Sequence, residues 1–98
     1  MIMVRTVFQT QWGKTNEVVA GMAEGLRRGS EGHEHKMKLL TDLSGEFHTL
    51  VLEAQFESLA AWEQFRHRLF SNPEFQNSRQ DQLMVAGRQE FYTIEAEF

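Results

Sequence analysis

Three short stretches in the second half of the chain decide the fold: LAAWEQF at residues 59–65, NPEF at 72–75 and RQEFYTI at 88–94. In the first stretch Trp62 and Phe65 stand three residues apart, which is the spacing of one helix face. Asn72 and Pro73 mark a new helix start, because Asn caps a helix and Pro is tolerated in its first turn. We predict that this short helix runs to about Met84. The last stretch alternates polar and apolar residues, as a strand does.

Alternation predicts three further strands upstream, over residues 2–12, 35–43 and 47–56, and it extends the last strand over 88–98. A turn around Ser44-Gly45 joins the second and third strands into a hairpin. Ala86-Gly87 is predicted to lie between the short helix and the last strand, because glycine commonly ends a helix.

Two main helices are predicted between these strands. The first follows Gly13, is capped by Thr15 or Asn16, and is ended by the segment from Gly29 to Gly32. Its apolar residues recur at spacings of three and four and form one buried stripe: Val18, Val19, Met22, Ala23 and Leu26. Ser58 is predicted to cap the second helix.

The resulting order is βαββαβ, which is the ferredoxin-like split βαβ motif of the α+β class. Right-handed crossovers place both helices on one face of a four-stranded antiparallel sheet. Residues 1–98 are predicted to form a single domain, because one hydrophobic core suffices at this length.

The second face of the predicted sheet is neither dry nor fully polar. It carries Arg5, Thr49 and Glu53 together with Val7 and Val51. Such a mixed face is too apolar to leave wholly in water and too polar for a core. A second copy of the chain would cover it, so we predict a homodimer, the commonest symmetric assembly.

The three stretches that decide the fold also carry a resemblance. With them the chain resembles the dimeric α+β barrel superfamily, in particular its NIPSNAP-like and antibiotic-biosynthesis-monooxygenase-like members, over nearly its whole length. The resemblance implies a dimeric barrel. It implies no single activity, because the superfamily includes metal-free monooxygenases, haem degraders, isomerases and members of unknown role.

Composition excludes several classes of function. The net charge of -4 argues against a nucleic-acid-binding surface, which needs clustered Lys and Arg. No stretch reaches the roughly 20 apolar residues of a membrane span. The chain has no Cys, which excludes disulfides and thiolate sites and fits a cytoplasmic location. We expect neither a nucleic-acid nor a membrane partner.

His48 is the candidate catalytic residue. Alternation places it on the helix-facing side of the third strand, near the strand end. One interpretation is a histidine at the margin of the core, hydrogen-bonded to backbone. The other is a general base that opens onto a pocket between sheet and helices.

Four further residues are candidates for a ligand pocket: Arg5, Trp12, Glu53 and Tyr92. Pockets combine an apolar lining with a few fixed polar groups, and these side chains supply both kinds. The structural alternative, which we favour, is that Arg5 neutralises Glu53 or Glu90 across neighbouring strands.

No metal or cofactor is predicted. His33 and His35 flank Glu34 in a glycine-bounded loop and would need ligands from elsewhere to hold a metal ion. In haem-degrading relatives a helix-two histidine ligates the iron, and a strand-one asparagine shapes the pocket with a tryptophan. His67 and Trp62 match this pattern in part, but strand one has no asparagine and His67 is expected to be exposed.

Two functions follow as hypotheses. The first is a homodimeric barrel whose cavity binds a small organic molecule, aromatic or polyketide-like, and oxidises it as a cofactor-independent monooxygenase. The second is a non-catalytic dimeric module that binds a ligand or another protein.

Overall fold

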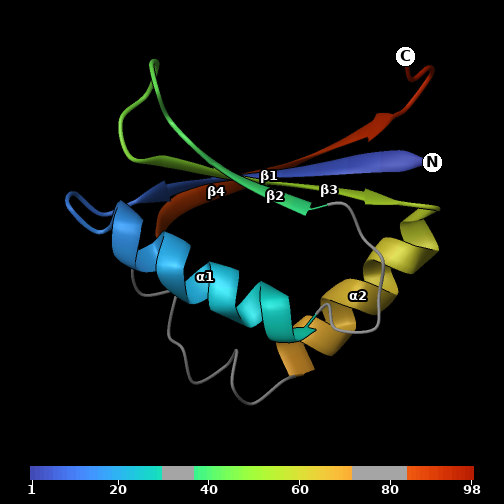
Figure 1. Ribbon diagram of the computed structural model, residues 1–98, viewed down its shortest axis with the longest axis horizontal. Coiled ribbons are helices and arrows are strands. Elements are labelled where there is room, and N and C mark those ends of the chain that lie inside the picture. The colour runs from blue at the N-terminus through green and yellow to red at the C-terminus, as the bar shows by residue number, and fades with distance from the viewer. Residues whose placement is uncertain (30–36, 72–83) are drawn as a thin grey trace.

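Both helices lie on the same face of one four-stranded antiparallel sheet, and no described helix or strand covers its other face, which we call the open face (Figure 1). This computed structural model describes residues 1–29, 37–71 and 84–98. Its elements, in chain order, are β1 (Ile2–Thr10), α1 (Thr15–Gly29), β2 (Met37–Thr41), β3 (Thr49–Phe56), α2 (Leu59–Ser71) and β4 (Met84–Thr93). The sheet order is β2-β3-β1-β4, so β1 lies in the centre and pairs antiparallel with both β3 and β4. The predicted α+β ferredoxin-like fold is confirmed.

The core lies between the sheet and the helices. The predicted stripe of α1 is confirmed, because Val18, Met22 and Leu26 are buried at intervals of four residues. Leu50, Ala54 and Phe56 of β3 face them from the sheet, together with Val4 of β1 and Phe65 of α2. Phe56 and Phe65 join sheet to helix, with ring centroids 5.5 Å apart. Burial of this apolar set holds both helices on one face.

The predicted cap of α2 is confirmed. Ser58 Oγ accepts a hydrogen bond from the backbone N–H of Ala61 at 3.2 Å, and the Ser58 carbonyl accepts the first helical bond from Trp62 N. The predicted cap of α1 is wrong. Val18 N donates to the Lys14 carbonyl, so Lys14 holds the cap position and Thr15 is the first helical residue.

The predicted start of the third strand is also wrong, because β3 begins at Thr49 and not at Phe47. His48 has a φ of 58°, in the left-handed region that strands do not use. Its carbonyl accepts a hydrogen bond from Thr10 N at 2.9 Å, which holds this conformation against the end of β1. His48 therefore belongs to the β2–β3 connection.

β4 begins at Met84, four residues before the predicted start, and ends at Thr93, five residues before the predicted end. Ala86 and Gly87, predicted to precede the strand, lie within it and pair with Gln9 and Phe8 of β1. Met84, predicted to close a short helix, pairs with Thr10 after a register irregularity. The rest of that predicted helix, and His33 and His35, lie outside the described residues.

Among the helices that the structure describes, none is both long and apolar enough to cross a membrane.

Candidate functional site

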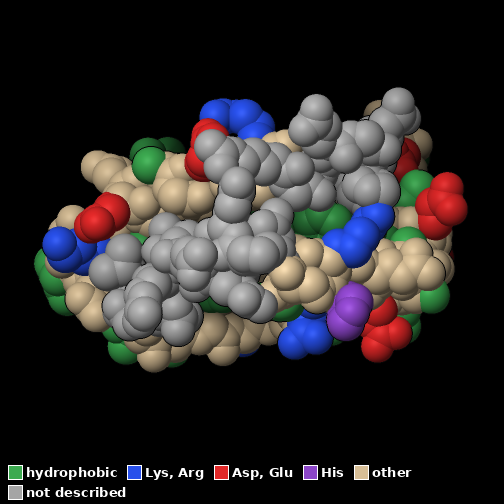
Figure 2. All heavy atoms as spheres, turned by 90° about the horizontal axis from the view of Figure 1, so that it is seen from below, with side chains coloured by type: hydrophobic (Ala, Val, Ile, Leu, Met, Phe, Trp, Pro, Cys, Tyr) green, Lys and Arg blue, Asp and Glu red, His purple; other side chains and the backbone are tan. Residues whose placement is uncertain are grey.

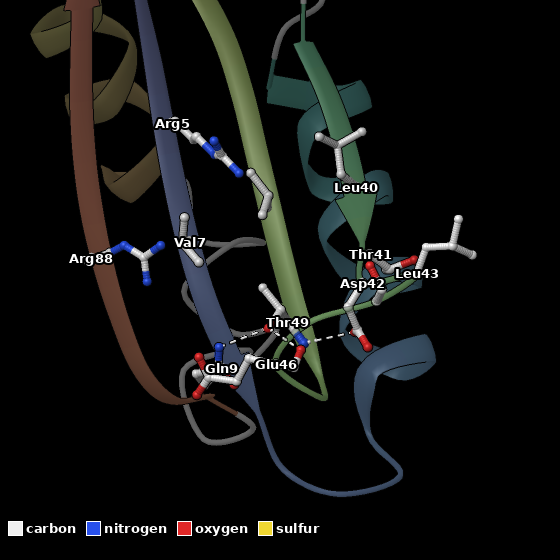
Figure 3. Close-up of a pocket in the computed structure, with 12 residues that line it drawn as sticks. Arg5, Val7, Gln9, Leu40, Thr41, Asp42, Leu43, Glu46, Thr49 and Arg88 are labelled. Atoms are coloured by element: carbon white, nitrogen blue, oxygen red, sulfur yellow. Dashed lines mark hydrogen bonds between the residues drawn. The ribbon is translucent and has the colours of Figure 1, made fainter.

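The candidate site is a groove of about 440 Å³ on the open face of the sheet (Figure 3). β1, β3, β2 and β4 all contribute to it, and the β2–β3 connection closes one end. Its floor is apolar, because Val7 and Val51 are paired neighbours on β1 and β3. They are only 4% and 7% exposed, although no described helix or strand forms a second layer over them.

Side chains on the open face form rows across the sheet, because the strand register sets paired residues side by side. We call one of them the charged row: Lys38 of β2, Glu53 of β3, Arg5 of β1 and Glu90 of β4. Its charges alternate in sign. The neighbouring row consists of Leu40, Val51, Val7 and Arg88. Val7 and Val51 form the groove floor, and Arg88 forms a positively charged wall.

Arg5 and Arg88 both lie near the carboxylate of Glu90, where the charged row borders the groove. Arg5 Nε lies 3.9 Å from Glu90 Oε1, and Arg88 Nε lies 3.8 Å from Glu90 Oε2. The interpretation that Arg5 neutralises an acidic residue on a neighbouring strand is thus confirmed for Glu90. Both distances exceed hydrogen-bond length, and Arg5 Nε is buried without a hydrogen-bond partner among the described residues. Donor capacity therefore remains on both guanidinium groups.

A polar network built around Thr49 closes the opposite end of the groove. The Thr49 hydroxyl donates to the Glu46 carbonyl at 2.8 Å and accepts from Gln9 Nε2 at 2.9 Å. Thr49 N donates to Asp42 Oδ1 at 3.0 Å, and Asp42 N returns a bond to the Thr49 carbonyl at 3.2 Å. Figure 3 shows Gln9, Thr49 and Asp42 side by side, at the ends of β1, β3 and β2 respectively. These bonds fix the hairpin on the sheet and leave Asp42 Oδ2 without a partner in the part of the chain described.

A second pocket of about 390 Å³ lies on the helix side, between β4 and α2. Phe8, Trp62, Phe65 and Phe70 give it an aromatic lining. The Arg66 guanidinium lies 5.2 Å from the Phe70 ring centroid and 5.9 Å from that of Trp62, which is cation–π range. This side of the molecule carries charges of both signs, interspersed over its described surface (Figure 2).

His48 lies in neither pocket. Its Nδ1 is 3.3 Å from Thr15 Oγ1, which in turn is 2.8 Å from the hydroxyl of buried Thr10. The Trp12 ring meets the imidazole edge-on, with centroids 4.3 Å apart, and is itself 78% exposed. His48 thus lies at the margin of the core, as in the first interpretation, but its imidazole contacts a side-chain hydroxyl and not the backbone of a described residue. The catalytic role of His48 stays a prediction.

The structure brings only some of the predicted ligand residues together. Arg5 lines the open-face groove, and Glu53 stands beside it in the charged row. Tyr92 is on the same face, one row further from the groove, paired with Met3. Trp12 lies on the loop after β1 and lines neither pocket. His67 is exposed, as expected, and no three His, Asp or Glu side chains of the described residues gather in a way that could hold a metal ion.

Sequence reasoning missed Arg88 and Asp42 as groove residues. Arg88 could have been found by parity, because it stands four positions before Tyr92 in the same strand and so shares its face. Asp42 could not, because its place at the groove depends on how the hairpin folds back onto Thr49.

No protein-family model matches the sequence, and no curated protein matches it significantly. Solved structures do share its fold. An uncharacterised NIPSNAP domain protein from Burkholderia xenovorans is 16% identical, with a TM-score of 0.82 over 98% of this chain and 96% of its own. A NIPSNAP family protein from Agrobacterium tumefaciens is 13% identical, with a TM-score of 0.82 over 98% of this chain and 88% of its own.

A third similar structure is a candidate antibiotic biosynthesis monooxygenase from Nitrosomonas europaea. It is 9% identical, with a TM-score of 0.76 over 98% of this chain and all of its own (100%). At such identities the likeness establishes the fold and leaves the activity open. The fold of the single chain is the one that the sequence resemblance implied, and the dimer stays a prediction.

Proposed function

We propose that this protein is a homodimer that pairs through the open faces of its sheets and binds a small organic molecule in the enclosed groove. The observation that carries the proposal is the groove itself, with a floor of two valines and walls of arginine, glutamine and threonine. An apolar floor with a few convergent polar groups is the usual construction of a small-molecule site.

Two features of the open face support pairing with a second copy. Leu40 and Tyr92 remain 39% and 45% exposed at opposite edges of this face. The charged row also complements itself. A twofold axis that runs along the strands between β3 and β1 reverses the row, so that Glu53 of each copy meets Arg5 of the other and Lys38 meets Glu90.

Cofactor-independent oxidation is the reaction that we propose for the bound molecule. The support is the shared fold with candidate antibiotic biosynthesis monooxygenases. In such a step an electron-rich phenolic CH₂ compound reacts with O₂. One oxygen atom becomes a carbonyl on the substrate carbon, the other leaves as water with the two hydrogens, and the substrate supplies all the electrons.

The alternative is a non-catalytic dimeric module that binds a ligand or another protein. It is favoured by the position of His48, which stands outside the groove and beneath Trp12. On this alternative the groove binds its ligand, and oxygen consumption with any substrate stays at background.

Light scattering at micromolar concentration tests the dimer, with twice the chain mass of 11.4 kDa as the expected result. A monomeric mass would overturn the proposal. Oxygen uptake with anthrone-type and phenolic substrates then separates the two functions. Turnover that is lost in Arg88→Gln and kept in Arg27→Gln, an exposed arginine of α1, would support oxidation in the groove.

A further inference from the structure

We propose that the groove ligand is a small hydroxylated organic acid, bound with its carboxylate at the arginine end and its hydroxyl at the hairpin end. This inference rests on the binding part of the proposed function, because it names the ligand class of the same groove. The acids named below are binding probes, and the CH₂ oxidation proposed above is not assigned to them. It follows from an uneven distribution of charge along the groove.

The arginine end carries an excess of positive charge and of hydrogen-bond donors. The four charges of the charged row cancel, so Arg88 in the next row adds one uncompensated cation. Figure 3 shows Arg88 beside Val7 on the neighbouring strand, and Arg5 on the same strand as Val7, one row further along. Neither guanidinium makes a hydrogen bond to any residue that the structure describes, since their contacts to Glu90 are 3.8 Å or longer. A carboxylate above Val7 would accept charge-assisted hydrogen bonds from both.

The hairpin end is negative and rich in acceptors. Asp42 and Glu46 both line it, and the structure gives neither of them an ion pair with another described residue. Asp42 uses Oδ1 for Thr49 N, and its Oδ2 faces no described donor. A second carboxylate on the ligand would be repelled here, whereas a hydroxyl would donate to Asp42. The ligand is therefore an acid at one end only.

The strand register sets the length of the ligand. The row of Val7 and Arg88 is two residues from the row of Gln9, Thr49 and Asp42. At about 3.3 to 3.4 Å per residue, the two ends lie about 7 Å apart. A para-hydroxylated benzoic acid spans a comparable distance, and its ring would lie between these two rows.

Titration of the intact protein with 4-hydroxybenzoate, followed by NMR and calorimetry, tests the inference. We expect saturable binding, weakened at least about tenfold in Arg88→Gln, because the lost bonds are charge-assisted. The neutral analogue 4-hydroxybenzamide should bind at least about tenfold more weakly. Asp42→Asn, which keeps an acceptor for Thr49 N, should weaken 4-hydroxybenzoate more than benzoate. Arg27→Gln should change nothing.

Failure of this inference is distinct from failure of the proposed function. Equal affinity for the acid and the amide, or unchanged affinity in Arg88→Gln, would overturn the ligand class while leaving a dimer with a small-molecule groove. A monomer, or a dimer that binds none of the acid, the amide and phenol in this groove, would overturn both.

Discussion

Thr49 is the residue on which the hairpin end of the groove depends. Its hydroxyl joins Gln9 of β1 to the Glu46 carbonyl, and its N–H is held by Asp42. Thr49→Val keeps the shape and removes both hydroxyl bonds. We expect the free energy of unfolding to fall by about 1 to 2 kcal/mol, because each bond contributes about 0.5 to 1.5 kcal/mol. Urea denaturation measures this loss.

The matched control is Thr93→Val at the end of β4, where the structure gives the hydroxyl no hydrogen bond to another described residue. It should change stability by less than about 0.5 kcal/mol. Equal effects at Thr49 and Thr93 would show that the network contributes nothing.

Gly87 leaves little room for a side chain, and its φ does not lie in the left-handed region that favours glycine. A Cβ at this position would lie 3.3 Å from Phe8 Cδ1 and 3.5 Å from the Val7 carbonyl oxygen. Gly87→Val adds a Cβ and two methyl groups at this contact, so Phe8 must move from its place against the core. We expect a loss of about 1 to 3 kcal/mol in the free energy of unfolding, as for other overpacked sites.

Ala86→Val, one position earlier on the same strand and exposed, is the control for Gly87. It adds the same branched side chain without contact to Phe8 and should leave thermal stability nearly unchanged. If Gly87→Val unfolds at the same temperature as this control, the packing argument fails.

Single residues of the site were predictable only where strand parity decides them. Parity placed Arg5, Val7, Glu53 and Val51 on one face, and the register confirms it. It failed for His48, because the left-handed φ of this residue takes it out of the strand. A hydrogen bond from Thr10, 38 residues away, holds that conformation. Such a contact has no signature in the local sequence pattern.

At the scale of elements, the side chain of Ser58 caps the N-terminus of α2. Ser58 Oγ accepts from Ala61 N, one of the helix N–H groups that have no partner within the helix. Ser58→Ala should lower the free energy of unfolding by about 1 kcal/mol. Ser58→Asp should restore it, because Asp caps equally well and favours the positive end of the helix. A failure of Asp to rescue would assign the loss to something other than capping.

The order and type of the described elements followed from the sequence, as did the ends of α1 at Gly29 and of β3 at Phe56, but the ends of β4 did not. The helix-facing alternation of β3 and the three-four spacing of α1 both reflect burial against one core, and burial is what the pattern encodes. The ends of β4 depend instead on pairing with β1, which extends the strand back through Gly87 to Met84. In the local sequence Gly87 is typical of a residue that ends a helix. In the sheet, its missing side chain instead leaves room for Phe8.

At the scale of the whole molecule, the two faces of the sheet stand in contrast. The helices bury one face, while two valines of the other face form the floor of a groove whose lining includes arginine, glutamine and threonine side chains. A twofold partner would cover this face, enclose the groove and lower the local dielectric around Arg5 and Arg88. Their attraction for a carboxylate would then be stronger than on an open surface. Assembly and ligand binding are thus expected to reinforce each other.

Negative charge placed on the open face should prevent dimerisation, and Leu40 and Tyr92 are exposed apolar residues of that face. Leu40→Glu combined with Tyr92→Glu places four new carboxylates in the proposed interface of a dimer, where burial of unpaired charge is costly. Both side chains are partly exposed in the single chain, so the variant should fold and show an unchanged circular dichroism spectrum. Light scattering should report the mass of one chain.

The control is Leu59→Glu on α2, at a residue that is 56% exposed on the helix side. It adds a carboxylate away from the open face and should leave the dimer intact. If the double variant keeps the dimeric mass, the open face is not the interface, and a groove enclosed by two sheets is excluded with it.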